Sequence, residues 1–342
     1  MPSRLALALD AGAIALPDAG RVLLLRPPGD LDLAELTASG LATDRLCAVT
    51  GFRPDHDRLA ARGVAVADAP EGSFDAAVVF LPRARALGRD LIARAVAAVP
   101  EGAPVIVDGA KTDGIDAMLR ALRARVDLTS AFAKAHGKCA AFPAPAQLDD
   151  WRVRDGGFDG FVTAPGIFSA DGVDPGSALL ADALPPLSGR VADLGAGWGY
   201  LAHRVLVASP EVTTLDLVEA ERAALDCARR NVTDGRAAFH WADATTWPEE
   251  AGAASCDVVI ANPPFHPGRR PDPALGAGFV AAAARLLTPR GRLWMVANRH
   301  LPYEEPLDAA FAEVVERRGD NRYKLFEAAR PKAARTAARR RA

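Results

Sequence analysis

Residues 189–200 read GRVADLGAGWGY, and this stretch decides the fold. An apolar strand ends at Asp193. It is followed by a loop with glycines at 195, 197 and 199, and then by a helical segment. Glycine lets the backbone turn sharply and lets a ligand approach the amide groups at the start of the helix. The stretch therefore predicts a strand, loop and helix at the ligand-binding edge of an α/β sheet. Alone it does not choose a ligand, because such loops serve dinucleotides, other nucleosides or nothing.

The same order of segments occurs twice along the chain. GRVLLLRPPGD, from Gly20, aligns with GRVADLGAGWG, from Gly189, and FDAAVVFLP, from Phe74, aligns with CDVVIANPP, from Cys256. Strands that alternate with helices are typical of a mostly parallel sheet. We therefore predict an α/β protein with two tandem Rossmann-like domains that arose by duplication. A chance match between two generic α/β halves is the alternative.

Apolar runs and helical patterns give the expected elements of each half. The first half has expected strands at 21–25, 45–50, 64–67, 74–82 and 103–109, and expected helices from about 32, over 56–62 and over 87–99. The second half has expected strands at 189–194, 212–220, 238–244, 256–264 and 291–298, and expected helices at 223–232 and 278–287. Pro143 and Pro145 place the joint within 133–151. The predicted domains are 1–145 and 146–330, followed by a basic tail at 331–342 that is either solvated or an RNA-contacting arm.

Composition excludes several classes of protein. The chain has 342 residues with Lys+Arg 41 against Asp+Glu 43, a net charge of −2, so no global positive field draws it to nucleic acid. The four cysteines are widely separated, which argues against a disulfide framework and against a metal site. No apolar stretch is long enough to span a bilayer. We expect a reduced, cytoplasmic protein without a metal or membrane contact.

Two strand-end acids sharpen the ligand prediction. Glu219 ends the strand after the glycine loop, where a carboxylate can accept hydrogen bonds from both ribose hydroxyls; Asp216 is its rival. Asp243 follows the third strand, where it can accept from an adenine amine beside Trp241 or Ala242, or can merely cap the next turn. With Asp193 and the glycines, these acids describe a site for a nucleoside with a polar tail rather than a pyrophosphate. The pattern favours S-adenosylmethionine over NAD.

The fourth strand ends in Asn262-Pro263-Pro264-Phe265-His266. The prolines stiffen a loop beside the crevice at the carboxyl edge of the sheet. The side-chain oxygen of Asn262 and the carbonyl of Pro263 can both accept from one planar amine and so aim its lone pair at a methyl group. Phe265 offers a flat face for a base turned out of its stack, and His266 can bind that base or cap the loop. These residues predict methylation of an exocyclic amine; a rigid turn with Phe265 in the core is the alternative.

These motifs resemble the class I S-adenosylmethionine-dependent methyltransferases that modify exocyclic amines. FVTAPGIFSADGVDPGSALL (161–180), NPPFH and the closing segment from Ala297 are similar to the bacterial ribosomal RNA guanine-N2 methyltransferases, particularly the small-subunit type. The resemblance implies that Phe168, Ser169, Asp174 and Ser177 lie in a segment that folds over the cofactor. It also implies that the first domain is degenerate. The sequence agrees, because the first half has RPPGD where the second half has the glycine loop. Both domains are then Rossmann-like methyltransferase domains, and we predict one active site in the chain, not two.

The predicted activity is S-adenosylmethionine-dependent N2-methylation of a guanine in 16S ribosomal RNA, on a flipped base. Arg269 and Arg270 are placed to meet phosphates that flank the flipped nucleotide. The partner is ribosomal RNA or the small subunit, and we expect a monomer. The alternatives are N5-glutamine methylation of a protein, adenine-N6 methylation, and a non-catalytic RNA-binding assembly factor.

Overall fold

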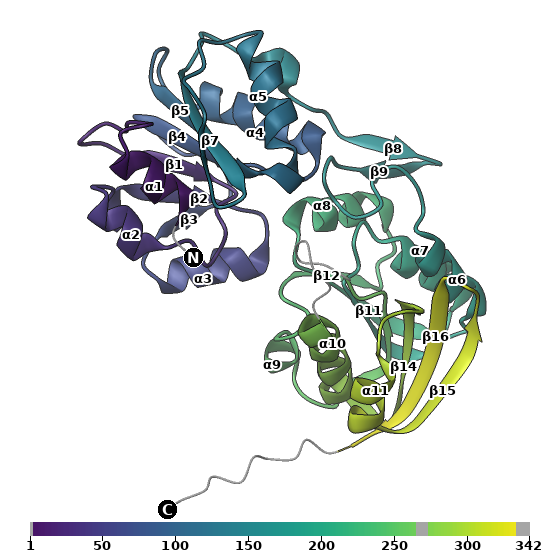
Figure 1. Ribbon diagram of the computed structural model, residues 1–342. Coiled ribbons are helices and arrows are strands. Elements are labelled where there is room, and N and C mark those ends of the chain that lie inside the picture. The colour runs from purple at the N-terminus through teal and green to yellow at the C-terminus, as the bar shows by residue number, and fades with distance from the viewer. Residues whose placement is uncertain (1–2, 265–272, 333–342) are drawn as a thin grey trace, which may run out of the picture. The chain divides into compact units, whose positions relative to one another are not determined.

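The computed structural model describes residues 3–264 and 273–332, and the chain forms two compact units (Figure 1). The first unit comprises Met1–Gly156 with Ala164–Gly166, and the second comprises Gly157–Thr163 with Ile167–Ala342. The division after residue 156 lies beyond the joint expected from the prolines. Each unit carries its own seven-stranded sheet.

The first unit begins with a short helix and then alternates strands and helices. Its elements are α1 (Arg4–Asp10), β1 (Val22–Leu25), α2 (Leu33–Ala38), β2 (Leu46–Val49), α3 (Arg53–Ala61), β3 (Ala65–Ala67), β4 (Ala76–Phe80), α4 (Arg85–Ala97), β5 (Pro104–Ala110), α5 (Ile115–Arg123), β6 (Phe132–Lys134) and β7 (Gly137–Pro143).

The second unit opens with a small hairpin and a helix before its own sheet. Its elements are β8 (Gly156–Phe158), β9 (Phe161–Thr163), α6 (Pro175–Ala183), β10 (Gly189–Leu194), α7 (Tyr200–Ala208), β11 (Val212–Glu219), α8 (Arg222–Asn231), β12 (Ala237–Trp241), α9 (Pro248–Ala251), β13 (Cys256–Ala261), α10 (Pro273–Leu286), β14 (Leu287–Asn298), α11 (Glu304–Ala310), β15 (Phe311–Gly319) and β16 (Tyr323–Pro331).

Both large sheets have the same topology. The strand order is β3-β2-β1-β4-β5-β7-β6 in the first unit and β12-β11-β10-β13-β14-β16-β15 in the second. The strands pair in parallel except that β7 and β16 run antiparallel to both of their neighbours. The order reverses at β1 in one sheet and at β10 in the other, which is where ligands bind in open α/β sheets. The predicted fold class, two tandem Rossmann-like units, is confirmed.

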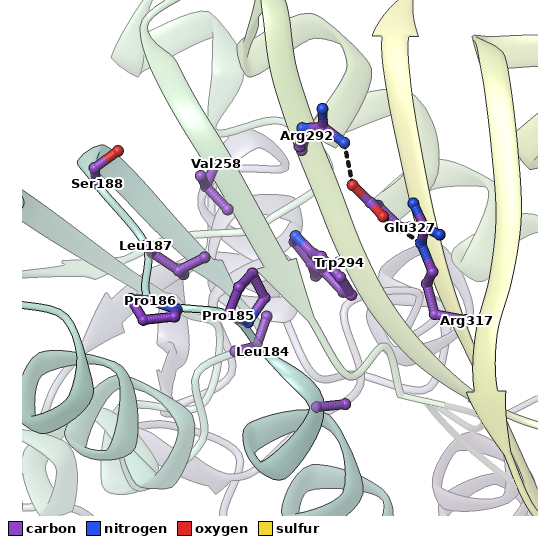
Figure 2. A pocket seen from close by; sticks show the side chains of 11 residues that line it. Leu184, Pro185, Pro186, Leu187, Ser188, Val258, Arg292, Trp294, Arg317 and Glu327 are labelled. Atoms are coloured by element: carbon purple, nitrogen blue, oxygen red, sulfur yellow. Dashed lines mark hydrogen bonds and ion pairs between the residues drawn. The ribbon is translucent and has the colours of Figure 1, made fainter.

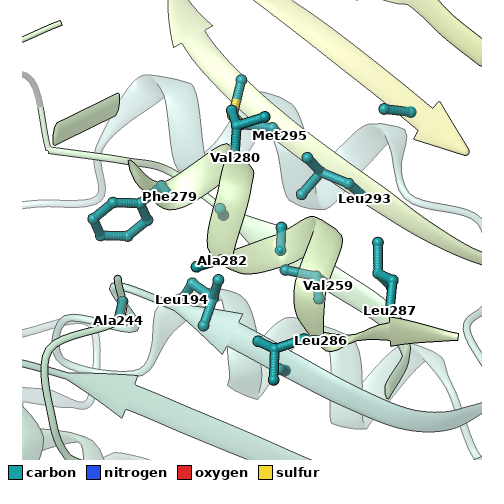
Figure 3. Packing of buried hydrophobic residues seen from close by; sticks show 14 of the residues in the cluster. Leu194, Ala244, Val259, Phe279, Val280, Ala282, Leu286, Leu287, Leu293 and Met295 are labelled. Atoms are coloured by element: carbon teal, nitrogen blue, oxygen red, sulfur yellow. The ribbon is translucent and has the colours of Figure 1, made fainter. Parts of the chain in front are cut away.

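The central strands of the second sheet are buried on both faces: successive side chains point to opposite sides, and each side packs against other elements. Leu194 of β10 packs with Phe279, Leu286 and other residues of α10 on one face (Figure 3). Val191, on the other face, packs with Leu201 of α7. The central strands therefore read as nearly continuous apolar runs, as expected for a parallel sheet covered by helices.

Most predicted elements lie within a few residues of those observed, but the joint region differs. Residues 137–143 form β7, a buried strand between β5 and β6, rather than a connection. Pro143 is the last residue of this strand, where a missing amide costs little. Among the described residues, no helix is long and apolar enough to cross a bilayer.

Candidate active site

The glycine loop turns sharply from β10 into α7. Gly195, Gly197 and Gly199 all have positive φ angles, of 78°, 56° and 92°. A Cβ at Gly199 would lie 2.9 Å from Cγ2 of Val232, so glycine is required for α7 to approach α8. At Gly197 a Cβ would meet no described atom within 4 Å, so this part of the loop faces open space.

Asp193 is an acid whose side chain is completely buried. Its exposed fraction is 0 %, and neither carboxyl oxygen makes a hydrogen bond of normal geometry to a described residue. Burial raises the pKa of Asp193 to about 8, the nearby Glu219 carboxylate adds to the rise, and the amide of Ala202 opposes it. An unpaired buried carboxyl group is costly in a fold, and this makes Asp193 a functional candidate.

Glu219 lies at the end of β11 beside the glycine loop. Its carboxylate accepts hydrogen bonds from the amide of Gly197 at 2.8 Å and from the amide of Glu221 at 2.7 Å. Burial raises the pKa of Glu219, although these amides oppose the rise. A carboxylate oxygen has a further lone pair, so the group can still accept from a ligand hydroxyl.

Asp216, the rival acid, lies deeper in the sheet. It accepts from Nε of Arg190 at 2.9 Å and shares a hydrogen bond with Nε2 of His240 at 2.8 Å. These two partners outweigh the effect of burial and lower the pKa of Asp216. Asp216 therefore forms an ion-pair network across three strands, whereas Glu219 is the acid that faces the loop.

Asp243 caps the turn that follows β12. Its Oδ1 accepts from the amide of Thr245 at 2.8 Å and from the hydroxyl of Thr245 at 2.7 Å. The capping contact that the sequence left as an alternative is thus present, and no hydrogen bond to Oδ2 from the described part of the chain is found. Nearby, the ring of Trp241 is covered by the guanidinium of Arg222 at 3.8 Å.

Asn262 stands immediately after β13, at the same sheet edge as the glycine loop. In the parallel pairing of β10 and β13, Leu194 is opposite Ala261, so Asn262 follows β13 where Gly195 follows β10. The amide nitrogen of Asn262 donates to Oδ2 of Asp174 at 2.9 Å and to the hydroxyl of Ser177 at 2.8 Å. Pro263 is buried and Pro264 is exposed.

The segment before α6 meets both Asn262 and the glycine loop. Asp174 caps α6 by accepting from the amide of Ser177 at 2.8 Å. The carbonyl of Ser169 accepts from Nε1 of Trp198 in the glycine loop at 3.2 Å. Phe168 is 56 % exposed, which is unusual for a large apolar side chain.

Asn231, at the end of α8, is a residue that the sequence analysis missed. Its Nδ2 donates to the carbonyls of Val162 and Trp198 at 2.8 Å each, and its Oδ1 accepts from the amide of Val162 at 2.7 Å. It therefore joins β9 to the glycine loop. An asparagine at the end of a helix is common, so no local pattern distinguished it.

Phe265, His266, Arg269 and Arg270 lie outside the described residues. Among the described residues, no group of three or more His, Cys, Asp or Glu side chains is arranged to hold a metal ion.

A groove of about 590 Å³ lies elsewhere in the second unit (Figure 2). The chain after α6, including Leu184 and Pro185, forms one wall, and Trp294 with Arg292 of β14 forms another. Arg292 and Arg317 both pair with the buried Glu327. None of the predicted site residues that the structure describes lines this groove.

The equivalent positions of the first unit are chemically different. β1 pairs with β2 and β4 in the register that β10 makes with β11 and β13, with Leu25 in the place of Leu194. By this register Asp193, Glu219 and Asn262 are replaced by the following residues: Leu24, Thr50 and Phe80.

The loop of the first unit keeps the turn but not the glycines. Arg26 takes the place of Gly195 with a φ of 57°, and its backbone amide donates a hydrogen bond to the carbonyl of Val49 at 2.8 Å. Gly29 in this loop donates to Oδ1 of Asp55 at 2.9 Å, while its carbonyl accepts from Arg62 at 3.0 Å.

The strand order, the glycine loop and the polar groups at one sheet edge define a Rossmann-like methyltransferase in the second unit. The methyltransferase small domain family matches residues 160–327. Ribosomal RNA small subunit methyltransferase C of Hahella chejuensis is 30% identical over 343 residues, covering 91% of this chain and 94% of that relative. The protein of the same name from Shewanella halifaxensis is 32% identical over 268 residues, covering 74% and 77% of the two chains.

The chain belongs to the ribosomal RNA small subunit methyltransferase C family. The family resemblance inferred from the sequence is thus confirmed, and the protein is a ribosomal RNA methyltransferase. Its fold is also that of a solved structure, the T. thermophilus 16S rRNA N2 G1207 methyltransferase (RsmC) in complex with AdoMet and guanosine. That structure has a TM-score of 0.77 and 22% identity, and the match covers 96% of this chain and 92% of that chain.

Proposed function

We propose that the protein methylates the exocyclic N2 of a guanine in 16S ribosomal RNA, with S-adenosylmethionine as the methyl donor. The observation that carries this proposal is the place of Asn262, directly after β13 and beside the glycine loop. Family membership supports ribosomal RNA as the substrate. The T. thermophilus relative of the same fold is described with guanosine, which favours guanine over adenine as the target base.

The residues of the second unit fit S-adenosylmethionine. This cofactor has an ammonium group for the unpaired carboxyl of Asp193 and ribose hydroxyls for Glu219. Gly195, Gly197 and Gly199 allow the close approach, Asp243 is suited to an adenine amine, and Phe168 can cover the ligand from the exposed segment. When bound, the cofactor supplies an electrophilic methyl group on a sulfonium.

Asn262 and Pro263 orient the accepting amine. The side-chain oxygen of Asn262 and the carbonyl of Pro263 each accept one hydrogen from the exocyclic amine, which aims its lone pair at the methyl carbon. Such alignment supplies a large share of the acceleration of a transfer between two bound groups. A bound S-adenosylmethionine would supply the methyl group from its sulfonium, and Asn262 and Pro263 would hold the amine in line with it until the methylated amine gives its surplus proton to water. Phe265 and Pro264 would then hold the flipped base. His266 would contact the base or a phosphate, and Arg269 and Arg270 would contact the flanking phosphates.

The first unit does not carry a second active site in this proposal. Leu24, Thr50 and Phe80 offer no buried carboxyl, no strand-end acid and no amide at the three positions that matter. We infer that the first unit is a degenerate domain that assists the catalytic domain. We also infer that the protein is a monomer and that it lies in the cytoplasm, where ribosomal RNA is available.

The proposal is tested by offering three acceptors with labelled S-adenosylmethionine: unmodified 16S ribosomal RNA, small subunits lacking the modification, and a release factor. Nucleoside analysis should find the label as N2-methylguanosine in one or both RNA samples. Label in N6-methyladenosine, or in the release factor alone, would contradict it. RNA binding without transfer to any acceptor would favour the assembly-factor alternative.

A further inference from the structure

We infer that Asp174 and Ser177 are positioning residues that fix the orientation of the Asn262 side-chain amide; this inference rests on the proposed function. Asp174 is the N-cap of α6 and Ser177 lies in its first turn. Both are far from Asn262 in sequence, yet both accept from its nitrogen, at 2.9 and 2.8 Å. The sequence resemblance placed Asp174 against the cofactor instead.

The two hydrogen bonds engage the nitrogen of the Asn262 amide and leave its oxygen for the substrate. A primary amide has two N–H donors and one carbonyl oxygen. The carboxylate of Asp174 can only accept, so it must face the nitrogen of Asn262 and not its oxygen. With both donors engaged by Asp174 and Ser177, the oxygen is left for the amine of the substrate.

The reverse orientation of the amide is disfavoured at both ends. It would bring the oxygen of Asn262 against the carboxylate of Asp174, and it would present N–H donors to an amine whose own hydrogens need acceptors. A polar group that loses its partner away from water is destabilising. Donation to a charged carboxylate also polarises the amide and makes its oxygen a better acceptor.

The sequence DPGS at 174–177 holds this turn in place. Asp174 caps the helix through the amide of Ser177 at 2.8 Å, and Pro175 occupies the first helical position, where its missing N–H costs nothing. A Cβ at Gly176 would lie 2.9 Å from Cε1 of Tyr323 on β16, so glycine lets the turn pack directly on the sheet. The turn thus packs against Tyr323 and also accepts hydrogen bonds from Asn262.

Asp174→Ser and Asp174→Asn separate positioning from capping. Serine keeps a helix cap but removes the carboxylate that meets Asn262. Asparagine keeps both the cap and an acceptor oxygen for Asn262. Ser177→Ala removes the second acceptor and leaves the capping bond to its backbone amide. Asp182→Ser, a surface residue of the same helix paired with Arg204, is the matched control.

At saturating cofactor and RNA we expect kcat to fall about 100-fold in Asp174→Ser and about 10-fold in Ser177→Ala, since misplacing one catalytic group costs about this much. The dissociation constant for S-adenosylmethionine should change less than about threefold, because each substitution removes a contact to Asn262 and not one of the proposed contacts to the cofactor. Asp174→Asn should recover most of kcat, and Asp182→Ser should match the wild type. A tenfold or greater loss of cofactor affinity with unchanged kcat would overturn the inference, as would an Asp174→Asn variant as slow as Asp174→Ser.

A second measurement does not depend on the acceptor. In the cofactor-bound protein, the side-chain amide protons of Asn262, assigned by comparison with Asn262→Asp, should exchange slowly with solvent. They should exchange much faster in Asp174→Ser. Equal exchange in the two proteins would overturn the inference. If the wild type methylates an amine other than guanine N2, the proposed function fails, but this comparison still decides the role of Asp174.

Discussion

Asp193 is the residue at which stability and function most clearly oppose each other. Its buried carboxyl group makes no hydrogen bond of normal geometry to the residues that the structure describes, and its pKa is raised to about 8. The unfolded chain ionises this group near pH 4, so the folded state loses stability as the pH rises from about 4 to about 8. The penalty is fully present above pH 8. A cation bound at Asp193 would remove it.

We expect Asp193→Asn to raise the melting temperature of the ligand-free protein, more at pH 8 than at pH 5. The same change should weaken S-adenosylmethionine binding at least about 10-fold, because a charged partner is lost. Thermal scans at the two pH values and titration calorimetry measure both effects. A melting temperature that falls equally at both pH values would contradict this account of the carboxyl group.

Proton release reports the same group in the wild type. At pH 7 the carboxyl group is mostly protonated, and binding the ammonium of the cofactor should drive the proton off. The binding enthalpy should therefore vary with the ionisation enthalpy of the buffer in the wild type, and much less in Asp193→Asn. An enthalpy independent of the buffer in the wild type would place the ammonium elsewhere.

The site residues differ in how far the sequence could place them. Asp193, Glu219 and Asn262 were predicted because each ends a strand, and parallel strands bring their carboxyl ends to one edge. The hydrogen bonds of Asn262 to Asp174 and Ser177 were not predicted, because pairing across 88 and 85 positions of sequence leaves no local pattern. The capping contact of Asp243 was foreseen only as an alternative.

At the scale of elements, α10 supports both the core and the glycine loop. Phe279 lies near the middle of this helix and Leu286 is its last residue, and both belong to the same cluster (Figure 3). A Cβ at Gly195 would lie 3.3 Å from Cε1 of Phe279, so this ring packs directly under the loop. Leu286 is fully buried in the same cluster.

Phe279→Ala and Leu286→Ala should each destabilise the second unit by about 2–5 kcal/mol, the range for large-to-small core substitutions. Only Phe279→Ala should also weaken cofactor binding, because it removes support from the glycine loop. Denaturant unfolding and titration calorimetry on both variants test this. Equal losses of cofactor affinity would show that the loop depends on general stability and not on the ring.

The elements themselves were predicted where the pattern was local. Continuous apolar runs gave the central strands of both sheets, and glycine spacing gave the loop before α7. The strand β7 was read as a joint because Pro143 and Pro145 mark loops more often than strand ends. Its place between β5 and β6 is set by sheet pairing, which the sequence does not display.

The whole molecule contains two units of one topology, of which we propose that only the second binds cofactor. The wild type should bind one S-adenosylmethionine per chain, and Glu219→Ala should weaken that single event because a ribose acceptor is lost. Calorimetric stoichiometry measures this, and Thr50→Ala, at the equivalent position of the first unit, is the matched control. Two binding events, or binding in Glu219→Ala equal to that of the wild type, would contradict the assignment.

The most direct test compares the wild type with Asn262→Ala on unmodified 16S ribosomal RNA. The wild type should produce N2-methylguanosine, identified by mass spectrometry of the digested RNA. Asn262→Ala should bind S-adenosylmethionine with nearly the wild-type dissociation constant and produce none. Methylation by Asn262→Ala at a rate near that of the wild type would contradict the claim that this strand-end amide holds the reacting amine.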